Sequence, residues 1–195
     1  MRLIFATNNK HKIEEIRSVI GDKLDLITLE EAGIEIDIPE PHNTLEENAR
    51  EKSRTIYKLT NTNCFSEDTG LEVDALNGEP GVHSARFAGD ERSFDKNIEK
   101  LLINLQGNPD RKARFRTIIS LIMDGKEFLF EGICKGTIID HKRGDKGFGY
   151  DPVFVPEGAD KTFSEMKLEE KNQYSHRKRA MDKLFVFLGH VLNNQ

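Results

Sequence analysis

The sequence predicts an α/β fold in which an elongated, mixed β-sheet is flanked by helices. Three observations predict it. A short apolar run at 3–7 leads through a polar turn into an amphipathic helical pattern, which is how a βα unit begins. Two long apolar runs flank Asp124-Gly125, a strong hairpin signal. The chain ends on a second amphipathic helical pattern. Because βα units and a hairpin occur together, the sheet should be mixed.

The first half of the chain alternates between extended and helical patterns. Thr44 to Glu47 has the sequence of a capping box, so a helix should begin there. We expect a break in extended structure at Thr69-Gly70. The expected elements are a strand at 3–7, a helix with Ile13, Ile16 and Ile20 on one face, extended segments at 24–29 and 35–39, a helix from Thr44 to about Leu59, and extended pieces at 64–68 and 71–76.

The second half places a hairpin between helical and glycine-rich segments. Gly78 to Gly81 is typical of a turn. The expected elements are a helix opened by Ser93 that carries Ile98, Leu101, Leu102 and Leu105, hairpin strands at 113–123 and 127–139, a glycine-rich loop at 144–149, a strand at 153–155, and a last helix capped by Ser175.

Length and composition favour one domain, 1–195, that needs no disulfide to fold. The net charge of −5 argues against a general nucleic-acid partner, which would call for a basic face. The two cysteines, Cys64 and Cys134, lack the CxxC spacing, which fits a reducing compartment. No apolar run is long enough for a signal peptide or a membrane span, so we expect a cytoplasmic protein with no membrane partner.

The common nucleotide-binding and hydrolase motifs are absent. The chain has no Gly-x-x-x-x-Gly-Lys-Ser/Thr loop and no Gly-x-Ser-x-Gly elbow. The run Gly147-Phe148-Gly149 lacks the third glycine of a dinucleotide fingerprint. Function must therefore be sought in other residue clusters.

The first cluster lies between the first strand and the first helix. Free backbone N–H groups and the positive end of a helix dipole make such a junction suitable for triphosphate oxygens. The alternative is ordinary capping, with Asn9 near the N-cap and the lysines in solvent. The candidate phosphate-binding residues are Thr7, Asn8, Asn9, Lys10, His11 and Lys12.

The second cluster is acidic and comprises Glu40 and the run Glu67-Asp68-Thr69. Mg²⁺ takes oxygen ligands, usually one or two carboxylates plus water and phosphates. Adjacent side chains of a strand point to opposite faces, so Glu67 and Asp68 should not hold one ion together. Asp68 is the stronger candidate because it directly precedes the turn. The alternative is an Asx-turn or cap before the glycine.

The third cluster is Phe148-Gly149-Tyr150-Asp151 in the glycine-rich loop. Glycines beside an aromatic ring let the ring stack on a flat base, which contributes about 1–3 kcal/mol, and Asp151 could accept hydrogen bonds from ring N–H groups. The alternative is a bulged turn with Phe148 packed in the core.

The fourth cluster is basic and comprises Lys171 and Ser175-His176-Arg177 near the start of the last helix. Its donors suit a carbonyl oxygen on a base. A capped helix with a solvated basic face is the alternative, and a DNA contact is a third interpretation. Lys52, inside a predicted helix, would by itself be placed on the surface.

Taken together, these segments resemble the Ham1/inosine triphosphate pyrophosphatase family over nearly the whole chain and in the family's order. Three residues depart from its pattern: Asn8 replaces a glycine, Glu67 an aspartate and Thr69 a serine. The matching stretches are Thr7 with Asn9 and Lys12, Glu47-Asn48-Ala49 with Lys52, Glu67 to Leu71, Pro80 to Phe87, Phe148 to Pro152, and Ser175-His176-Arg177.

The resemblance implies two lobes with a central substrate cleft, a homodimer, and cleavage of purine nucleoside triphosphates such as ITP, dITP and XTP to the monophosphate and pyrophosphate. It implies Mg²⁺, or Mn²⁺ in its place, held by Glu40 and Asp68, with Asp68 as catalytic base. Lys12 and Lys52 would face the phosphates, and Thr69 would hold phosphate or sugar. The competing functions are a non-catalytic nucleotide sensor and a metal-dependent nuclease or nucleic-acid binder.

Overall fold

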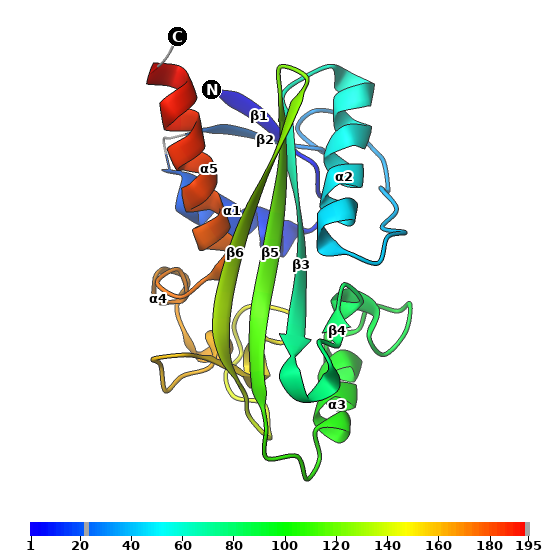
Figure 1. Ribbon diagram of the computed structural model, residues 1–195, viewed down its shortest axis with the longest axis vertical. Helices are drawn as coiled ribbons and strands as arrows, with labels where there is room; N and C mark the ends of the chain where they lie inside the picture. Colours follow the sequence, from blue (N-terminus) through cyan, green and yellow to red (C-terminus); the bar gives the residue numbers. More distant parts are fainter. Residues whose placement is uncertain (22–23, 194–195) are drawn as a thin grey trace. The chain divides into compact units, whose positions relative to one another are not determined.

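The computed structural model describes residues 1–21 and 24–193 (Figure 1). They form a seven-stranded sheet with the order β2-β1-β3-β5-β6-β7, and β4 pairs with β3. β1 pairs in parallel with β2 and β3, whereas β3–β4 and β6–β7 are antiparallel, so the predicted mixed α/β fold is confirmed. The strands are β1 (Arg2–Phe5), β2 (Asp25–Thr28), β3 (Cys64–Val73), β4 (Pro80–Gly81), β5 (Lys112–Met123), β6 (Lys126–Ile138) and β7 (Phe154–Pro156).

Five α-helices and four short 3₁₀ helices complete the described part of the chain. The α-helices are α1 (Lys10–Ile20), α2 (Leu45–Thr60), α3 (Phe94–Asn104), α4 (Leu168–Lys171) and α5 (His176–Asn193), and the 3₁₀ helices are Asp74–Leu76, Ser84–Arg86, Asp151–Val153 and Phe163–Glu165.

The chain divides into two compact units, each with its own apolar core. Single-domain organisation, two lobes and a central cleft stay predictions. The first unit comprises Met1–Asp68, Thr117–Gly132 and Arg177–Gln195, and the second comprises Thr69–Arg116 and Ile133–His176.

In the first unit, side chains of β1 alternate between two apolar clusters. Leu3 and Phe5 pack in the cluster that contains residues of α1 and α5, whereas Ile4 and Ala6 pack in the cluster that contains Ile56 of α2. Figure 1 shows the same layering, with α1 and α5 on one side of β1 and β2 and α2 on the other. A strand with successive residues buried on both faces reads as a continuous apolar run, as 3–7 does.

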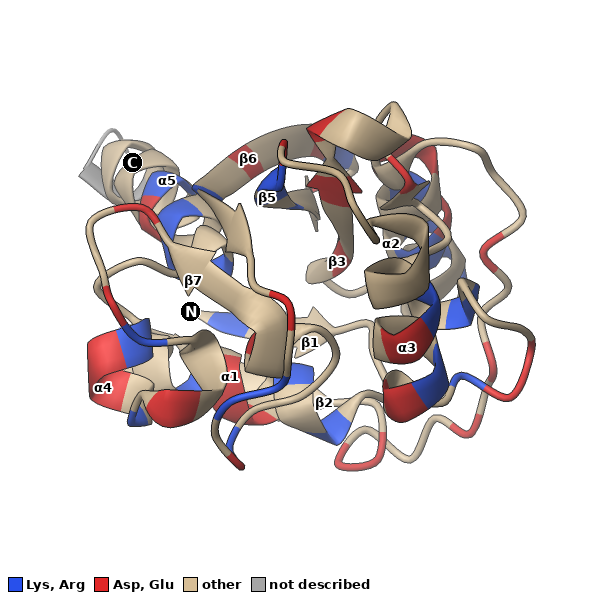
Figure 2. Cartoon of the chain, turned by 90° about the horizontal axis from the view of Figure 1, so that it is seen from below, with Lys and Arg blue, Asp and Glu red and all other residues tan. Residues whose placement is uncertain are grey.

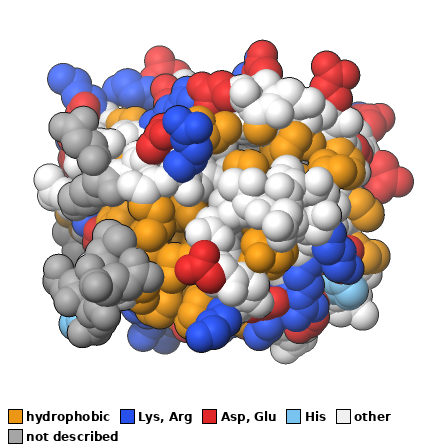
Figure 3. Space-filling model, turned by 90° about the horizontal axis from the view of Figure 1, so that it is seen from above, with side chains coloured by type: hydrophobic (Ala, Val, Ile, Leu, Met, Phe, Trp, Pro, Cys, Tyr) orange, Lys and Arg blue, Asp and Glu red, His pale blue; other side chains and the backbone are white. Residues whose placement is uncertain are grey.

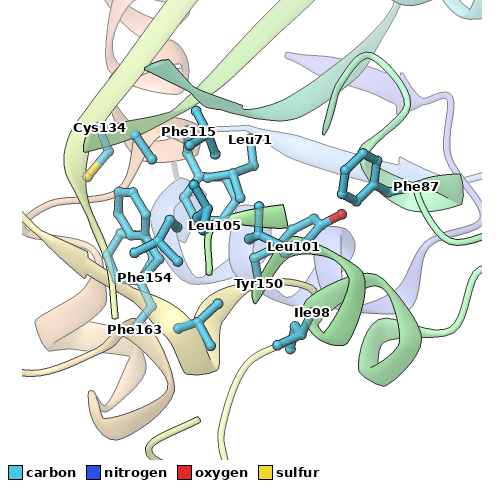
Figure 4. Close-up of a cluster of buried hydrophobic side chains, with 14 of the residues drawn as sticks. Leu71, Phe87, Ile98, Leu101, Leu105, Phe115, Cys134, Tyr150, Phe154 and Phe163 are labelled. Atoms are coloured by element: carbon cyan, nitrogen blue, oxygen red, sulfur yellow. The ribbon is translucent and has the colours of Figure 1, made fainter. Parts of the chain in front are cut away.

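The second unit is built around aromatic side chains (Figure 4). Phe115 of β5 contacts Phe154 and Phe163, with ring centroids 4.7 and 6.0 Å apart. Helix α3 contributes Ile98 and Leu101, which are three positions apart and therefore share one face. This core fixes the loop that contains Phe148, because residues 150, 153 and 154 belong to it.

The expected break at Thr69-Gly70 is wrong, because β3 runs without interruption from Cys64 to Val73. Gly70 serves a different purpose. A Cβ at this position would lie 2.4 Å from the carbonyl oxygen of Gly81, so only glycine lets β4 approach β3 this closely.

Local sequence signals at helix starts and at the hairpin are confirmed. The side chains of Asn9, Thr44 and Ser93 accept from the backbone N–H three residues on, at 3.2, 3.2 and 3.4 Å. Asp124 and Gly125, with φ of 50° and 75°, form the two-residue turn between β5 and β6.

Charges of both signs are mixed on the surface. Acidic and basic residues alternate along α3 in Figure 2, and Lys, Arg, Asp and Glu are interspersed among apolar side chains on the face in Figure 3. Neither view has the one-signed basic face of a general nucleic-acid binder. No helix among the described residues is both long and apolar enough to cross a membrane.

Candidate active site

Lys52, Glu40 and Asp68 meet at one buried point of the first unit. The Lys52 Nζ lies 2.6 Å from Glu40 Oε1 and 3.0 Å from Asp68 Oδ1. Lys52 comes from α2, Asp68 from β3, and Glu40 from the segment that precedes α2. The sequence alone places Lys52 on the surface, but its side chain is only 8% exposed. The two carboxylates predicted to share a metal therefore share an ammonium group.

Burial and charge oppose each other at this point. Burial raises the pKa of Asp68, and Lys52 and Lys12 only partly counter it. For Lys52, burial acts to lower the pKa, but Asp68 and Glu40 outweigh it and raise the pKa. The Asp68 Oδ2 atom is buried and has no hydrogen-bond partner within the described ranges. Asp68 thus keeps one oxygen for a further interaction.

Glu67 faces away from this pair, as strand alternation predicts. Its carboxylate receives two bonds from Arg177, at 2.7 and 2.9 Å, and lies 3.1 Å from the Lys12 Nζ. Burial acts to raise the pKa of Glu67, but Arg177 and Lys12 outweigh it and lower the pKa to about 2. Glu67 therefore remains charged and fixes Arg177 and Lys12.

Arg177 does not lie on the solvated basic face that was the alternative for the start of the last helix. Its guanidinium is 2% exposed and also donates to Glu15 in α1. Three of its five N–H groups are thus used by two carboxylates, which fixes the plane of the group. Sequence reasoning missed Glu15, because it lies off the stripe of Ile13, Ile16 and Ile20 and only the structure shows that it is buried.

The predicted phosphate-binding turn sits at the start of α1. Asn9 caps the helix, as one of the two interpretations expects, and its backbone N–H donates to Thr7 Oγ1 at 3.2 Å. The Asn8 side chain donates to the Ile36 carbonyl at 2.7 Å. Lys10 and His11 are exposed. Capping by Asn9 does not exclude a ligand, because other backbone N–H groups of the first helical turn lie outside the helix's own hydrogen bonds, and phosphate binding at this turn stays a prediction.

In the second unit, Asp151 organises the loop that contains Phe148. Its carboxylate accepts from the Lys171 Nζ at 2.5 Å and from the Phe148 N–H at 3.0 Å. Gly147, with φ of 73°, lies so close to Asp151 that a Cβ would be 2.1 Å from Oδ2. Phe148 is half-buried, with its ring 6.1 Å from that of Phe94. It is therefore not locked in the core.

Two neighbouring candidate residues of the second unit, Tyr150 and His176, are more buried than Phe148. Tyr150 is buried and its hydroxyl donates to the Ser84 carbonyl at 2.9 Å, so its side chain serves the core. His176 is 3% exposed, with its ring stacked on Phe115 at 4.7 Å. Thr69 is half-buried, and Gly149 adopts a φ of 62°. His176, like Arg177, does not lie on a solvated face.

These features define an α/β protein with a mixed sheet in which a buried lysine bridges the buried Asp68 and the partly exposed Glu40. The chain belongs to the Ham1 family, whose model matches residues 3–187.

Similar proteins of known name support this placement. A dITP/XTP pyrophosphatase of Porphyromonas gingivalis is 50% identical over 188 residues, which cover 96% of this chain and 97% of the relative. One of Flavobacterium johnsoniae is 48% identical, covering 96% and 98%. The solved Ham1 protein of Staphylococcus aureus has a TM-score of 0.88 and 40% identity, covering 97% of this chain and 99% of its own.

Proposed function

We infer that this chain hydrolyses purine nucleoside triphosphates with altered bases, such as ITP, dITP and XTP, to the monophosphate and pyrophosphate. The observation that carries this inference is the buried group of Asp68, Glu40 and Lys52. It supplies carboxylates for a metal and a cation for phosphate within a chain of the Ham1 family. The relatives' names supply the substrate class.

Glu40 and Asp68 suit a divalent metal such as Mg²⁺, or Mn²⁺ in its place. Both carboxylates reach one ammonium, so they lie close together, and Asp68 Oδ2 is a buried acceptor without a partner in the described chain. Mg²⁺ is usually held by one or two carboxylates and keeps water and phosphate ligands. Bound there, the metal would offset the charge that develops on the phosphates.

Asp68 acts as the base that accepts a proton from the attacking water. Its raised pKa makes the carboxylate a better proton acceptor, and its Oδ2 is the atom left for that proton. Water attacks the α-phosphorus, the bond to the bridging oxygen breaks, and pyrophosphate leaves. Lys12 and Lys52 oppose the charge on the leaving group.

The turn after β1 binds the phosphates. Thr7, Asn8, Asn9, Lys10 and His11 lie at the start of an eleven-residue helix, where the Thr7 hydroxyl, the Lys10 ammonium and backbone N–H groups of the first helical turn can donate to phosphate oxygens. Thr69, next to Asp68 in β3, binds phosphate or sugar through its hydroxyl.

The base is read by the Phe148 loop and the start of α5. Phe148 stacks on the purine, Gly149, Tyr150 and Asp151 meet its edge, and Lys171 holds Asp151 in place. His176 and Arg177 donate to the 6-oxo group of hypoxanthine or xanthine. Adenine presents an amino donor at that position, so in ATP a donor of the base would face the donors of the protein. Mispaired buried polar groups of this kind can lower the rate for the wrong substrate by a factor of about 10⁴ or more.

The active form is a homodimer in the cytoplasm. The S. aureus and P. gingivalis relatives support the family placement on which dimerisation rests. Both cysteines are buried and no disulfide joins them, which suits a reducing compartment.

A substrate panel tests the function. Pyrophosphate release is measured for ITP, XTP, ATP and single-stranded DNA, each with Mg²⁺ and with a chelator. We expect release from ITP and XTP only, and only with the metal. Phosphate without pyrophosphate would indicate a different hydrolase, cleavage of DNA a nuclease, and tight ITP binding without turnover a nucleotide sensor.

A further inference from the structure

One exposed side chain connects the turn after β1 to the segment that contains Glu40. Asn8 donates from Nδ2 to the carbonyl of Ile36 at 2.7 Å, across 28 positions of the chain. Because Asn8 is exposed, core packing does not explain this bond.

The segment from Ile34 to His42 is supported by side-chain packing and not by the hydrogen bonds of a helix or strand. It contains no helix or strand. Ile34, Ile36 and Ile38 are partly buried and pack against the apolar cluster on the α2 side of the sheet, and the two acidic residues between them are exposed. This alternation gives the segment a preferred face but no sheet partner.

The backbone at each of its two ends is held by hydrogen bonds. The Ile34 N–H donates to the Leu29 carbonyl at 2.8 Å. The Asn48 amide accepts from the His42 N–H at 2.9 Å and donates to the His42 carbonyl at 3.2 Å. Between these two ends, among the residues that the structure describes, the backbone of residues 35–39 is held by the hydrogen bond from Asn8.

Glu40 lies in this stretch, two residues before His42. Its side chain is 26% exposed and reaches Lys52 at 2.6 Å. Each residue of extended chain spans about 3.3–3.6 Å, so slack over a few residues moves a carboxylate by more than a hydrogen bond tolerates.

We propose that Asn8 is a positioning residue that fixes Glu40 against Lys52 and Asp68, and so couples the phosphate-binding turn to the two-carboxylate site. This inference rests on the proposed function, in which Glu40 is a metal ligand. Asn8 acts through the backbone of Ile36 and touches neither the metal nor the reacting atoms in this role.

The test begins with the segment itself, in the absence of nucleotide and metal. Asn8→Gly and Asn8→Asp both remove the amide donor but differ in charge. The order parameters of residues 35–38, measured by backbone ¹⁵N relaxation, should fall from the rigid value of about 0.85 to below about 0.6 in both variants. Asn43→Asp adds the same charge at an exposed position near Glu40 and should leave these values unchanged. Unchanged order parameters in both Asn8 variants overturn the proposal.

The second measurement is the affinity for Mn²⁺ alone, followed by water-proton relaxation. Losing one hydrogen bond of ordinary net strength should raise the dissociation constant about 3- to 10-fold in both Asn8 variants, with Asn43→Asp as the unchanged control. A loosened segment with unchanged Mn²⁺ affinity overturns the positioning role.

Glu40→Gln separates this inference from the function on which it rests. If Glu40→Gln weakens Mn²⁺ binding but the Asn8 variants do not, only the positioning role of Asn8 is wrong. If Glu40→Gln leaves Mn²⁺ binding unchanged, the proposed metal site itself is wrong.

Discussion

Two adjacent carboxylates of β3 have different partners and therefore different roles. Asp68 meets Lys52 and keeps an oxygen without a partner in the described chain, whereas Glu67 is fully engaged by Arg177 and Lys12. The separation follows from the alternation of side chains along a strand. We therefore predict a catalytic role for Asp68 and an anchoring role for Glu67.

Asp68→Asn should abolish most hydrolysis while triphosphate binding largely survives. The amide cannot accept the proton from water, and a general base typically contributes about 10²–10⁴-fold to the rate. Pyrophosphate release from ITP measures the first effect, and calorimetric titration with a non-hydrolysable ITP analogue measures the second. Turnover near that of the wild type would remove Asp68 as base and as ligand.

Lys171→Ala should mainly weaken nucleotide binding, so the Michaelis constant for ITP should rise more than kcat falls. Lys171 holds Asp151 in a buried pair, and its loss removes the cation that neutralises that carboxylate, at a cost of about 3–5 kcal/mol in stability. Kinetics are therefore measured well below the lowered Tm.

Lys161→Ala is the matched control for this variant, because Lys161 pairs with Glu170 at 2.9 Å in solvent. We expect both its Michaelis constant and its Tm to match the wild type. An unchanged Michaelis constant in Lys171→Ala would count against the binding role.

Residue types at the site were predictable from the sequence, but their burial was not. Lys52 has the sequence context of an ordinary surface lysine in a helix, and only the meeting of α2 with β3 makes it a buried cation. Arg177 lies 110 positions from Glu67 and 162 from Glu15, so no local pattern reveals the clamp.

At the scale of elements, signals that act within a few residues predicted the structure well. Caps at Asn9, Thr44 and Ser93 and the Asp124-Gly125 turn depend on neighbouring backbone only. The continuity of β3 through Gly70 depends on β4, because the glycine is needed for the approach of Gly81. The glycine inside this extended pattern thus marks a close contact between two strands and not the end of a strand.

Gly70→Ala should destabilise the protein by about 1–3 kcal/mol, the usual cost of forcing an extra methyl into a packed site. The new Cβ would meet the Gly81 carbonyl oxygen at 2.4 Å, and backbone cannot move aside as a flexible side chain can. Urea unfolding measures the change.

Gly189→Ala provides the opposite control, since a Cβ there meets nothing within 4 Å and the residue lies in α5. It should stabilise by about 0.5–1 kcal/mol, through the higher helix propensity of alanine and the lower entropy of the unfolded chain. Equal effects of the two substitutions would refute the role given to Gly70.

At the scale of the whole molecule, three strands contribute residues to both compact units. β3, β5 and β6 each cross the division of the chain, so each unit's core includes parts of the same strands. β5 contributes Phe115 to the core of the second unit and Leu121 to that of the first. Strand continuity therefore leads us to expect cooperative unfolding, and one domain over 1–195 stays a prediction.

Two buried cysteines test this cooperativity, one in each unit. Cys64 is fully buried and Cys134 is 1% exposed. Burial raises the pKa of Cys64 to about 12, so at pH 8 about one molecule in 10⁴ carries the reactive thiolate while folded. Because both thiols are buried, reaction with a thiol reagent requires unfolding around each cysteine. We expect both to become reactive at the same urea concentration, with each site followed by mass spectrometry of its peptide.

The variants Cys64→Ser and Cys134→Ser report each site separately and exclude an effect of labelling one cysteine on the other. In high urea both thiols should react at similar rates, which gives the unfolded reference. If Cys134 reacts at clearly lower urea than Cys64, the second unit unfolds alone and the chain behaves as two domains. Coincident transitions would instead show that the shared strands join the two cores into one cooperative structure.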